Sequence, residues 1–252
     1  MSSDIWTQRA GPSEIRGLRL TAWRVVESQH QVSTRKLVDT LEEQALLEEL
    51  IDSAKPPATP DTRQHYLLTT PFRYPPLTHG SRFGDRRERG IWYGAATVAT
   101  ALAEVAYYRL VFLEGTTADL GRITVELTAF RVHTRTARGV DLVEAPFAAH
   151  RRVIASPSRY RATQALGAAM RADGVEMCRY PSARDPHTGV NVAVFVPTVF
   201  GRSAPQGYQH WRCSADRDIV EITRRDLTVK ESLVFERRVF LVNHRLPMPA
   251  VE

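Results

Sequence analysis

The chain has 252 residues, of which 43% are hydrophobic and 25% are charged. This composition is ordinary for a globular protein and argues against a disordered chain, and the length allows one large domain or two small ones. The formal net charge of +6 favours an anionic partner, such as nucleic acid, a phosphorylated small molecule or an acidic protein, without choosing among them.

Nothing in the sequence indicates export or membrane insertion. The N-terminal stretch MSSDIWTQRAGPSEIRG has no apolar core of the kind a signal peptide needs, and the uninterrupted apolar runs are too short to span a bilayer. The two cysteines, Cys178 and Cys213, lie far apart and in no metal-ligand spacing. We therefore expect a reduced, cytoplasmic protein with no membrane contact, and a disulfide remains the alternative.

The first quarter of the chain predicts a strand and then a helical insertion. Residues 17–27, GLRLTAWRVVE, alternate around leucines and predict a strand. A helix is expected next, because Ser33 or Thr34 can cap it and four leucines follow at helical spacing. The prolines after Lys55 should end this helix and open a polar loop.

From residue 65 onward, strands and helices are mixed without strict β-α-β alternation, and this mixture predicts an α+β fold. The predicted strands are 65–70, 91–94, 122–134, 175–180, 190–196 and part of 218–242, and the predicted helices are about 97–113 and 158–172. A single domain over 1–252 is expected, with an N-terminal elaboration at about 28–64, a core at about 65–200 and C-terminal strands at about 205–245.

The stretch SRFGDRRERGIWYGAATVATALAE, residues 81–104, combines four arginines with a single carboxylate after a run of small residues. Arg82 stands apart from the charged run, in which Asp85 and Glu88 offset the other arginines. A guanidinium in this position can make bidentate contacts to phosphate oxygens. The alternative is a solvated surface loop.

Glu104 falls on the flank of the predicted helix 97–113, beside an apolar stripe that should face the core. Its neighbours on that flank include the small residues Thr97 and Ala101, and no basic residue lies at the i+4 position. Glu104 is therefore either a solvated glutamate or a carboxylate that faces a ligand. Tyr93, on the predicted strand 91–94, is either a half-buried core residue or an aromatic platform for a planar ring.

Other catalytic patterns are weaker. Ser182 lies near Asp185 and His187 but lacks the Gly-x-Ser-x-Gly context of a nucleophile elbow, so a turn serine that hydrogen-bonds a ligand is favoured over a serine hydrolase. The eight histidines are scattered without ligand spacing, and no metal is expected. Neither a Gly-x-Gly-x-x-Gly nor a Walker loop is present.

Three segments in order resemble the RES domain family, named for its Arg, Glu and Ser. These segments are AWRVVE, GSRFGDRRERGIWYGAATVATALAE and SRYRATQALGAAMRADGVEMCRYPSARDPHTGVNVAVFVP. The resemblance implies an ADP-ribosyltransferase-like mixed β core with flanking helices and an N-terminal helical elaboration. It also implies a toxin that acts on NAD. Its partner would be a cognate antitoxin with an Xre-like helix-turn-helix domain, through which alone DNA would be contacted.

Carried over residue by residue, the resemblance implies that Arg82, Tyr93, Glu104 and Ser182 lie at the site. The family's N-terminal arginine would be Arg24. The segment between Arg24 and Arg82 is longer here than in shorter family members, so Arg73 in PFRYPPL is the alternative for that role.

The resemblance also gives the opening stretch a mechanism. Nicotinamide leaves NAD as a neutral ring, so the group to stabilise is an oxocarbenium-like ribose, and one carboxylate, Glu104, can meet it. Arg82, with Arg24 or Arg73, would hold the diphosphate; Tyr93 would stack on nicotinamide and Ser182 would hydrogen-bond the ligand.

The acceptor is open among water, phosphate and a protein side chain. NAD glycohydrolase or phosphorylase activity is the first expectation and protein ADP-ribosylation the second. The third expectation is a non-catalytic basic module that binds nucleic acid. The sequence contains no helix-turn-helix, RRM or zinc-finger pattern that would support it.

Overall fold

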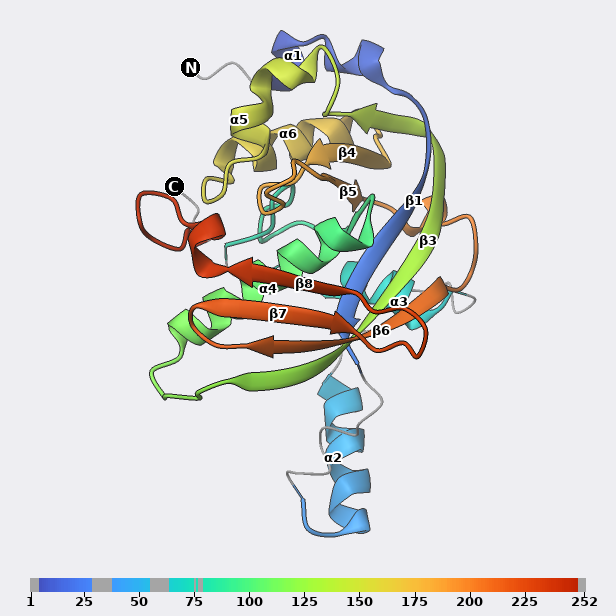
Figure 1. The fold of residues 1–252 in the computed structure, drawn as a ribbon. Coiled ribbons are helices and arrows are strands. Elements are labelled where there is room, and N and C mark those ends of the chain that lie inside the picture. Colours follow the sequence, from blue (N-terminus) through green and yellow to red (C-terminus); the bar gives the residue numbers. More distant parts are fainter. Residues whose placement is uncertain (1–4, 29–37, 55–63, 75, 77–78, 249–252) are drawn as a thin grey trace.

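A mixed β-sheet forms the centre of the computed structural model, which describes residues 5–28, 38–54, 64–74, 76 and 79–248 (Figure 1). Within these residues eight strands lie in the order β1-β2-β5-β4-β3-β6-β7-β8. Only β3 and β4 pair in parallel. The strands are β1 (Arg16–Glu27), β2 (Trp92–Ala95), β3 (Ile123–Asp141), β4 (Met177–Pro181), β5 (Val190–Val194), β6 (Gln206–Ala215), β7 (Ile219–Arg224) and β8 (Ser232–Glu236).

Five of these strands close on themselves. β1 pairs with β3 along its whole length and with β2 through Trp23 and Ala95, so β1, β2, β5, β4 and β3 form a circuit of hydrogen-bonded neighbours. The first half of β3 also pairs with β6, which extends the sheet to β7 and β8.

Helices cover the sheet and give the fold its α+β class. They are α1 (Ile5–Gln8), α2 (Leu41–Ala54), α3 (Tyr66–Arg73), α4 (Val98–Gly115), α5 (Arg151–Ile154) and α6 (Arg161–Ala172), with short 3-10 turns η1 (Gly11–Glu14), η3 (Phe147–His150), η4 (Pro197–Val199) and η5 (Arg237–Phe240). Figure 1 shows α2 extending away from the sheet, whereas α4 crosses the middle of the molecule.

Three apolar clusters hold these layers together. The first packs α4 against β3, β6 and β7 through residues such as Leu110, Leu127 and Trp211. The second packs α1, α5 and α6 against β4 and β5. The third fills the side of the closed circuit lined by Trp92 and Phe130, with α3 packed against it. Burial of these side chains, at about 25 cal/mol per Å² of apolar surface, is the main force holding α4 in place.

The strand predicted over residues 65–70 was wrong, because this segment forms helix α3. The His65 imidazole accepts a hydrogen bond from the Leu67 N–H and so caps the helix. Leu68 and Phe72 lie four residues apart, and both are buried in the third cluster. That i, i+4 pair of buried apolar residues favours a helix over the alternation of a strand.

The predicted N-terminal helix exists but begins later than expected. α2 starts at Leu41, and Thr40 caps it, since Thr40 Oγ1 accepts a hydrogen bond from the Glu43 N–H at 3.1 Å. The Glu43 carboxylate accepts from the Thr40 N–H in return, which completes a capping box. Ser33 and Thr34, the predicted caps, lie outside the described residues.

The other predicted elements are confirmed within a few residues, with one long extension. The strand expected over 122–134 continues as β3 to Asp141. The helix expected over 97–113 is α4, and its N-cap Thr97 accepts a hydrogen bond from the Thr100 N–H. Both cysteines are buried and free. No helix in the described part of the chain is long and apolar enough to cross a membrane.

Candidate active site

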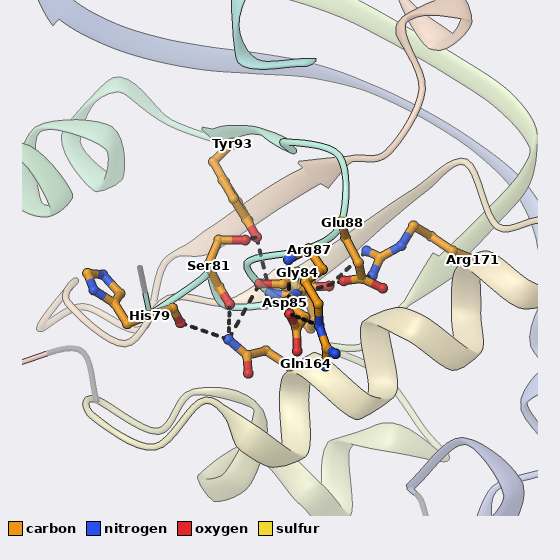
Figure 2. Close-up of polar contacts among 10 residues, drawn as sticks. His79, Ser81, Gly84, Asp85, Arg87, Glu88, Tyr93, Gln164 and Arg171 are labelled. Carbon is orange, nitrogen blue, oxygen red and sulfur yellow. Dashed lines mark hydrogen bonds and ion pairs between the residues drawn. The ribbon is translucent and has the colours of Figure 1, made fainter. Parts of the chain in front are cut away.

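The arginine-rich loop before β2 is fixed against helix α6. Figure 2 shows the Gln164 amide pointing into the loop, where its Nε2 donates to the carbonyl oxygens of His79 and Ser81 at 3.1 and 3.0 Å. Arg171, also on α6, donates to the Phe83 carbonyl and forms an ion pair with Glu88. Segments more than 80 residues apart in sequence are thereby joined, and the loop that carries Arg82 is held in one conformation.

Arg82 points into the protein and not into solvent. It is buried, and its Nη1 donates to the carbonyl oxygens of Ile154 and Ser156, both at 2.9 Å. Its guanidinium lies over the Tyr160 ring, 4.7 Å from the centroid, in a cation-π contact. Arg82 thus anchors the end of α5, and no described residue accepts a hydrogen bond from its Nε or Nη2.

Tyr93 is bound to the same loop. Its hydroxyl donates to Ser81 Oγ at 2.9 Å and accepts from the Phe83 N–H at 3.1 Å. Burial raises the pKa of Tyr93 to about 12, so the hydroxyl keeps its proton at neutral pH. The ring lies edge-on to Tyr180 on β4, and this arrangement makes a rigid aromatic wall beside the loop.

Glu104 on α4 is the centre of a polar cluster. Its Oε1 accepts hydrogen bonds from Ser182 Oγ at 2.8 Å and from Asn191 Nδ2 at 2.6 Å. Its other oxygen, Oε2, has no hydrogen-bond partner among the described residues, and the side chain is only half-buried. One oxygen therefore fixes the carboxylate while the other is left for a ligand.

Strand register explains why these groups meet. Asn191 on β5 lies directly opposite Tyr180 on β4, and Tyr93 on β2 lies opposite Ala193 on β5. Side chains of paired residues leave a sheet on the same face. Asn191, Tyr180 and Tyr93 therefore share one face of the sheet, and Asn191 meets Glu104 there.

The turn between β4 and β5 holds Ser182 in place. Ser182 Oγ accepts hydrogen bonds from the N–H groups of Arg184 and Asp185, both at 3.1 Å. The Asp185 carboxylate in turn accepts from Thr100 Oγ1 on α4 at 2.6 Å. A Cβ at Gly189 would lie 2.2 Å from both Asp185 Oδ2 and Thr100 Oγ1. Only glycine fits this contact between the turn and α4.

The bonding of Ser182 also bears on the serine-hydrolase alternative. Its hydroxyl donates to a carboxylate and accepts from two backbone N–H groups, and within the described residues no imidazole contacts it. His187, the histidine nearest in sequence, is exposed, and its backbone N–H donates to Asp185 Oδ1. A hydroxyl without a general base is a weak nucleophile.

A second buried arginine adjoins the cluster. The Arg184 guanidinium lies over the Tyr107 ring, 3.4 Å from the centroid, and its Nη2 donates to the Pro157 carbonyl. Burial raises the pKa of Tyr107 to about 12, against the opposing attraction of Arg184. Burial also raises the pKa of Tyr180, with the negative charge of Glu104 as the next cause. Tyr107, against which Arg184 packs, and Tyr180 therefore keep their hydroxyl protons at neutral pH.

The two candidates for the N-terminal arginine lie in different places. Arg24 on β1 donates through Nη1 to the Tyr93 carbonyl oxygen at 2.9 Å and lies over the Trp92 ring. Its strand partner is Phe130 of the third cluster, so the Arg24 side chain starts on the opposite face of the sheet from Asn191. Burial lowers the pKa of Arg24 to about 10. Arg73 ends α3, where its guanidinium lies over Tyr74.

The structure therefore brings Glu104 and Ser182 into direct contact and places Tyr93 on the same sheet face. Arg82 is joined to this group through the loop, and Arg24 through the backbone of Tyr93. Asn191 and Arg184 were missed by sequence reasoning. Asn191 had a signal, because it is the polar residue in the apolar strand VNVAVFV. Arg184, in a polar turn, had none.

The site thus combines a carboxylate, which a serine and an asparagine hold in place, with a buried arginine. Such a site suits a ligand that carries an anionic group and that develops positive charge at another atom. In the described residues, no group of three His, Cys, Asp or Glu side chains is placed to hold a metal ion. A family model for the RES domain matches residues 56–216, which is well over half of the chain. The chain belongs to the RES domain family.

The matched segment contains Arg73, Arg82, Tyr93, Glu104 and Ser182 and begins after Arg24. No match was found among curated proteins.

Proposed function

We propose that this RES domain protein is an enzyme that breaks the bond between nicotinamide and ribose in NAD. The observation that carries the proposal is the state of Glu104, with Oε1 held by Ser182 and Asn191 and Oε2 left without a partner among the described residues. A carboxylate fixed in this way can face a developing positive charge without having to reorganise first.

The chemistry needs few groups. As the C–N bond breaks, its electron pair goes to the nicotinamide nitrogen, which becomes neutral, and the ribose carbon becomes oxocarbenium-like. Glu104 would stabilise that carbon or hold the ribose hydroxyls. Removing one such preorganised group costs about 10²-fold to 10³-fold in rate in enzymes generally.

The remaining residues would bind and orient NAD. Arg82 retains Nε and Nη2 for the diphosphate, while its Nη1 is committed to the end of α5. Tyr93 and Tyr180 offer an aromatic wall for the nicotinamide ring. Arg24 stays the first of the two N-terminal candidates. It would act by supporting the backbone of Tyr93, because its side chain starts on the opposite face of the sheet from Asn191. Ser182 would act mainly by orienting Glu104.

The acceptor distinguishes three forms of the activity. Water gives an NAD glycohydrolase, phosphate a phosphorylase and a protein side chain an ADP-ribosyltransferase. Arg184 adjoins the cluster through its backbone N–H, which donates to Ser182, and Arg82 through the loop before β2; such guanidinium groups suit an inorganic anion as well as the diphosphate. The first form of the proposal is therefore NAD depletion by hydrolysis or phosphorolysis, and transfer to protein is the second.

Nicotinamide release from NAD by the purified protein, with and without phosphate, tests this function. The expected result is turnover by the wild type and its loss in Glu104→Gln, with Glu144→Gln, an exposed glutamate, as the matched control. If the purified protein releases no nicotinamide but labels lysate proteins from radioactive NAD, the activity is ADP-ribosyl transfer to protein and not hydrolysis. Absence of both would overturn the proposal.

NAD depletion also gives the expected biology. The chain would act as a toxin in the cytoplasm, controlled by an antitoxin with an Xre-like helix-turn-helix domain. Wild-type expression without the antitoxin should then arrest growth, and Glu104→Gln should be tolerated at equal protein level. Normal growth with abundant wild-type protein would contradict the toxin role.

A further inference from the structure

Strands β1 and β3 form a two-stranded ribbon over part of their length. β1 pairs with β2 only through Trp23, while β3 pairs with β6 up to Arg131 and with β4 only from Gly139. Between these points β1 and β3 pair mainly with each other, from Leu18–Thr136 to Ala22–Val132. Figure 1 shows the two strands running side by side along one side of the molecule.

The outer face of this ribbon is basic. Arg131, His133 and Arg135 alternate along β3 and are all exposed, whereas Val132 and Thr134 between them and Thr136 after them are buried. Arg19 on β1 is exposed as well and lies directly opposite Arg135. We call the face formed by Arg19, Arg131, His133 and Arg135 the basic strip.

The charges of the basic strip are not neutralised. Neither Arg19, Arg131 nor Arg135 forms an ion pair with a described residue. Where β3 begins and on β6, by contrast, exposed arginines are paired, as in Arg122 with Asp216 and Arg212 with Glu126. Like charges directly opposite each other destabilise a strand pair. The placement of Arg19 opposite Arg135 therefore does not help folding. An anionic partner that binds both side chains would explain it.

Neighbouring groups order the strip and extend it. Thr21 Oγ1 and His133 Nδ1 are hydrogen-bonded at 2.9 Å, which fixes the imidazole between the two arginines of β3. The Gly201 N–H donates to the His133 carbonyl oxygen, so the exposed Arg202 follows directly beside the strip. Residues two apart on one strand are spaced by about 6.8 Å. The result is a regular row of cationic and hydrogen-bonding groups.

We propose that the basic strip binds the phosphate backbone of double-stranded DNA. A two-stranded ribbon fits the major groove, which is about 12 Å wide. Arginine and threonine are among the residues that contact phosphates. The strip consists of three arginines and a histidine, whereas the core of a protein interface is depleted in charged residues.

The family resemblance implies contact with DNA only through an antitoxin, whereas the basic strip would contact DNA directly. It is independent of the NAD chemistry, since none of the strip residues contacts Glu104, Ser182 or Asn191 among the described contacts. The net charge of +6 of the whole chain acts in the same direction.

The test measures binding of a fluorescent DNA duplex of about three helical turns to the full chain between about 50 and 200 mM salt. The double variant Arg19→Ser/Arg135→Ser is compared with Arg151→Ser/Arg152→Ser, which removes two exposed, unpaired arginines from α5. Arms with single-stranded RNA and with polyglutamate distinguish other anionic partners.

The wild type should bind the duplex, and the strip variant should bind at least about tenfold more weakly. Its slope of log affinity against log salt should be shallower by about two. The α5 variant should bind like the wild type, and both variants should keep the wild-type NAD turnover. The strip variant should melt at or above the wild-type temperature, because it removes two like charges that lie opposite each other. Absence of duplex binding by the wild type, or equal loss in the two variants, would overturn the proposal. Preference for polyglutamate or for single-stranded RNA would also overturn it.

Discussion

Asn191 on β5 donates through Nδ2 to Glu104 Oε1 on α4 at 2.6 Å, across 87 residues of sequence. The contact exists because β5 lies between β2 and β4 and turns Asn191 towards α4. It orients the carboxylate on which the proposed chemistry depends. A hydrogen bond to a charged group contributes about 1.5–3 kcal/mol.

Asn191→Ala should therefore slow NAD turnover by about 10-fold to 100-fold, the rate equivalent of that energy. The loss should fall on kcat, with KM nearly unchanged, because Asn191 orients Glu104 and the bound diphosphate is held elsewhere. Steady-state kinetics of nicotinamide release measure both constants. A change confined to KM would show that Asn191 binds the substrate and does not position Glu104.

Ser182→Ala should affect both stability and turnover. The Ser182 hydroxyl donates to Glu104 and accepts from two backbone N–H groups of the turn, so the alanine variant leaves these groups without their partner. We expect the free energy of unfolding to fall by about 1–3 kcal/mol. Urea denaturation measures this loss. Threonine, which retains the hydroxyl, should recover most of it, and equal loss in the threonine variant would contradict the hydrogen-bonding role.

Two glycines near α4 should respond in opposite ways to alanine. Gly189→Ala places a Cβ 2.2 Å from Asp185 Oδ2 and Thr100 Oγ1, so the turn that carries Ser182 must move. Gly115→Ala meets nothing within 4 Å and lies at the end of α4. The first variant should lose stability and turnover, whereas the second should gain up to about 1 kcal/mol. Thermal unfolding of both variants tests the pair, and similar melting temperatures would refute this account of the turn.

Alkaline solution should destabilise the protein. Burial raises the pKa of Tyr93 and Tyr107 to about 12, above the unfolded-state value of about 10. Between these values the folded state keeps protons that the unfolded state has released. The free energy of unfolding should therefore fall as pH rises through this window, by up to about 1.4 kcal/mol per pH unit for each group.

Below about pH 10 the tyrosines are protonated in both states and contribute no pH dependence. Urea denaturation at several alkaline pH values measures the slope. Tyr93→Phe should be less stable at neutral pH, because it loses the contacts to Ser81 and Phe83, and should show a shallower alkaline slope. A slope identical to that of the wild type would contradict the raised pKa of Tyr93.

Local signals were sufficient for much of the fold and for part of the site. The helices expected over about 97–113 and 158–172 are present as α4 and α6. Glu104 could be singled out because it lacks a helical partner. Its actual partners, Ser182 and Asn191, come from another part of the chain, and strand register rather than helical periodicity brings them to it.

The failures have equally specific causes. The run from His65 to Thr70 is too short for periodicity to separate strand from helix, and burial of Leu68 with Phe72 decided for the helix. The phosphate-binding role given to Arg82 did not foresee that its Nη1 also donates to the carbonyl oxygens of Ile154 and Ser156. Tertiary packing brings these two carbonyl oxygens to Arg82 from more than 70 residues away, so no local sequence pattern could predict the contact.

The most direct test of the central claim is the rate of NAD loss with purified wild-type protein and with Glu104→Gln, in the presence and absence of phosphate. In the wild type, the free nicotinamide formed should equal the NAD lost. The rate should be at least about 10²-fold lower in the glutamine variant, with an unchanged melting temperature. NAD loss that proceeds equally well in the folded Glu104→Gln protein would contradict the role assigned to this carboxylate.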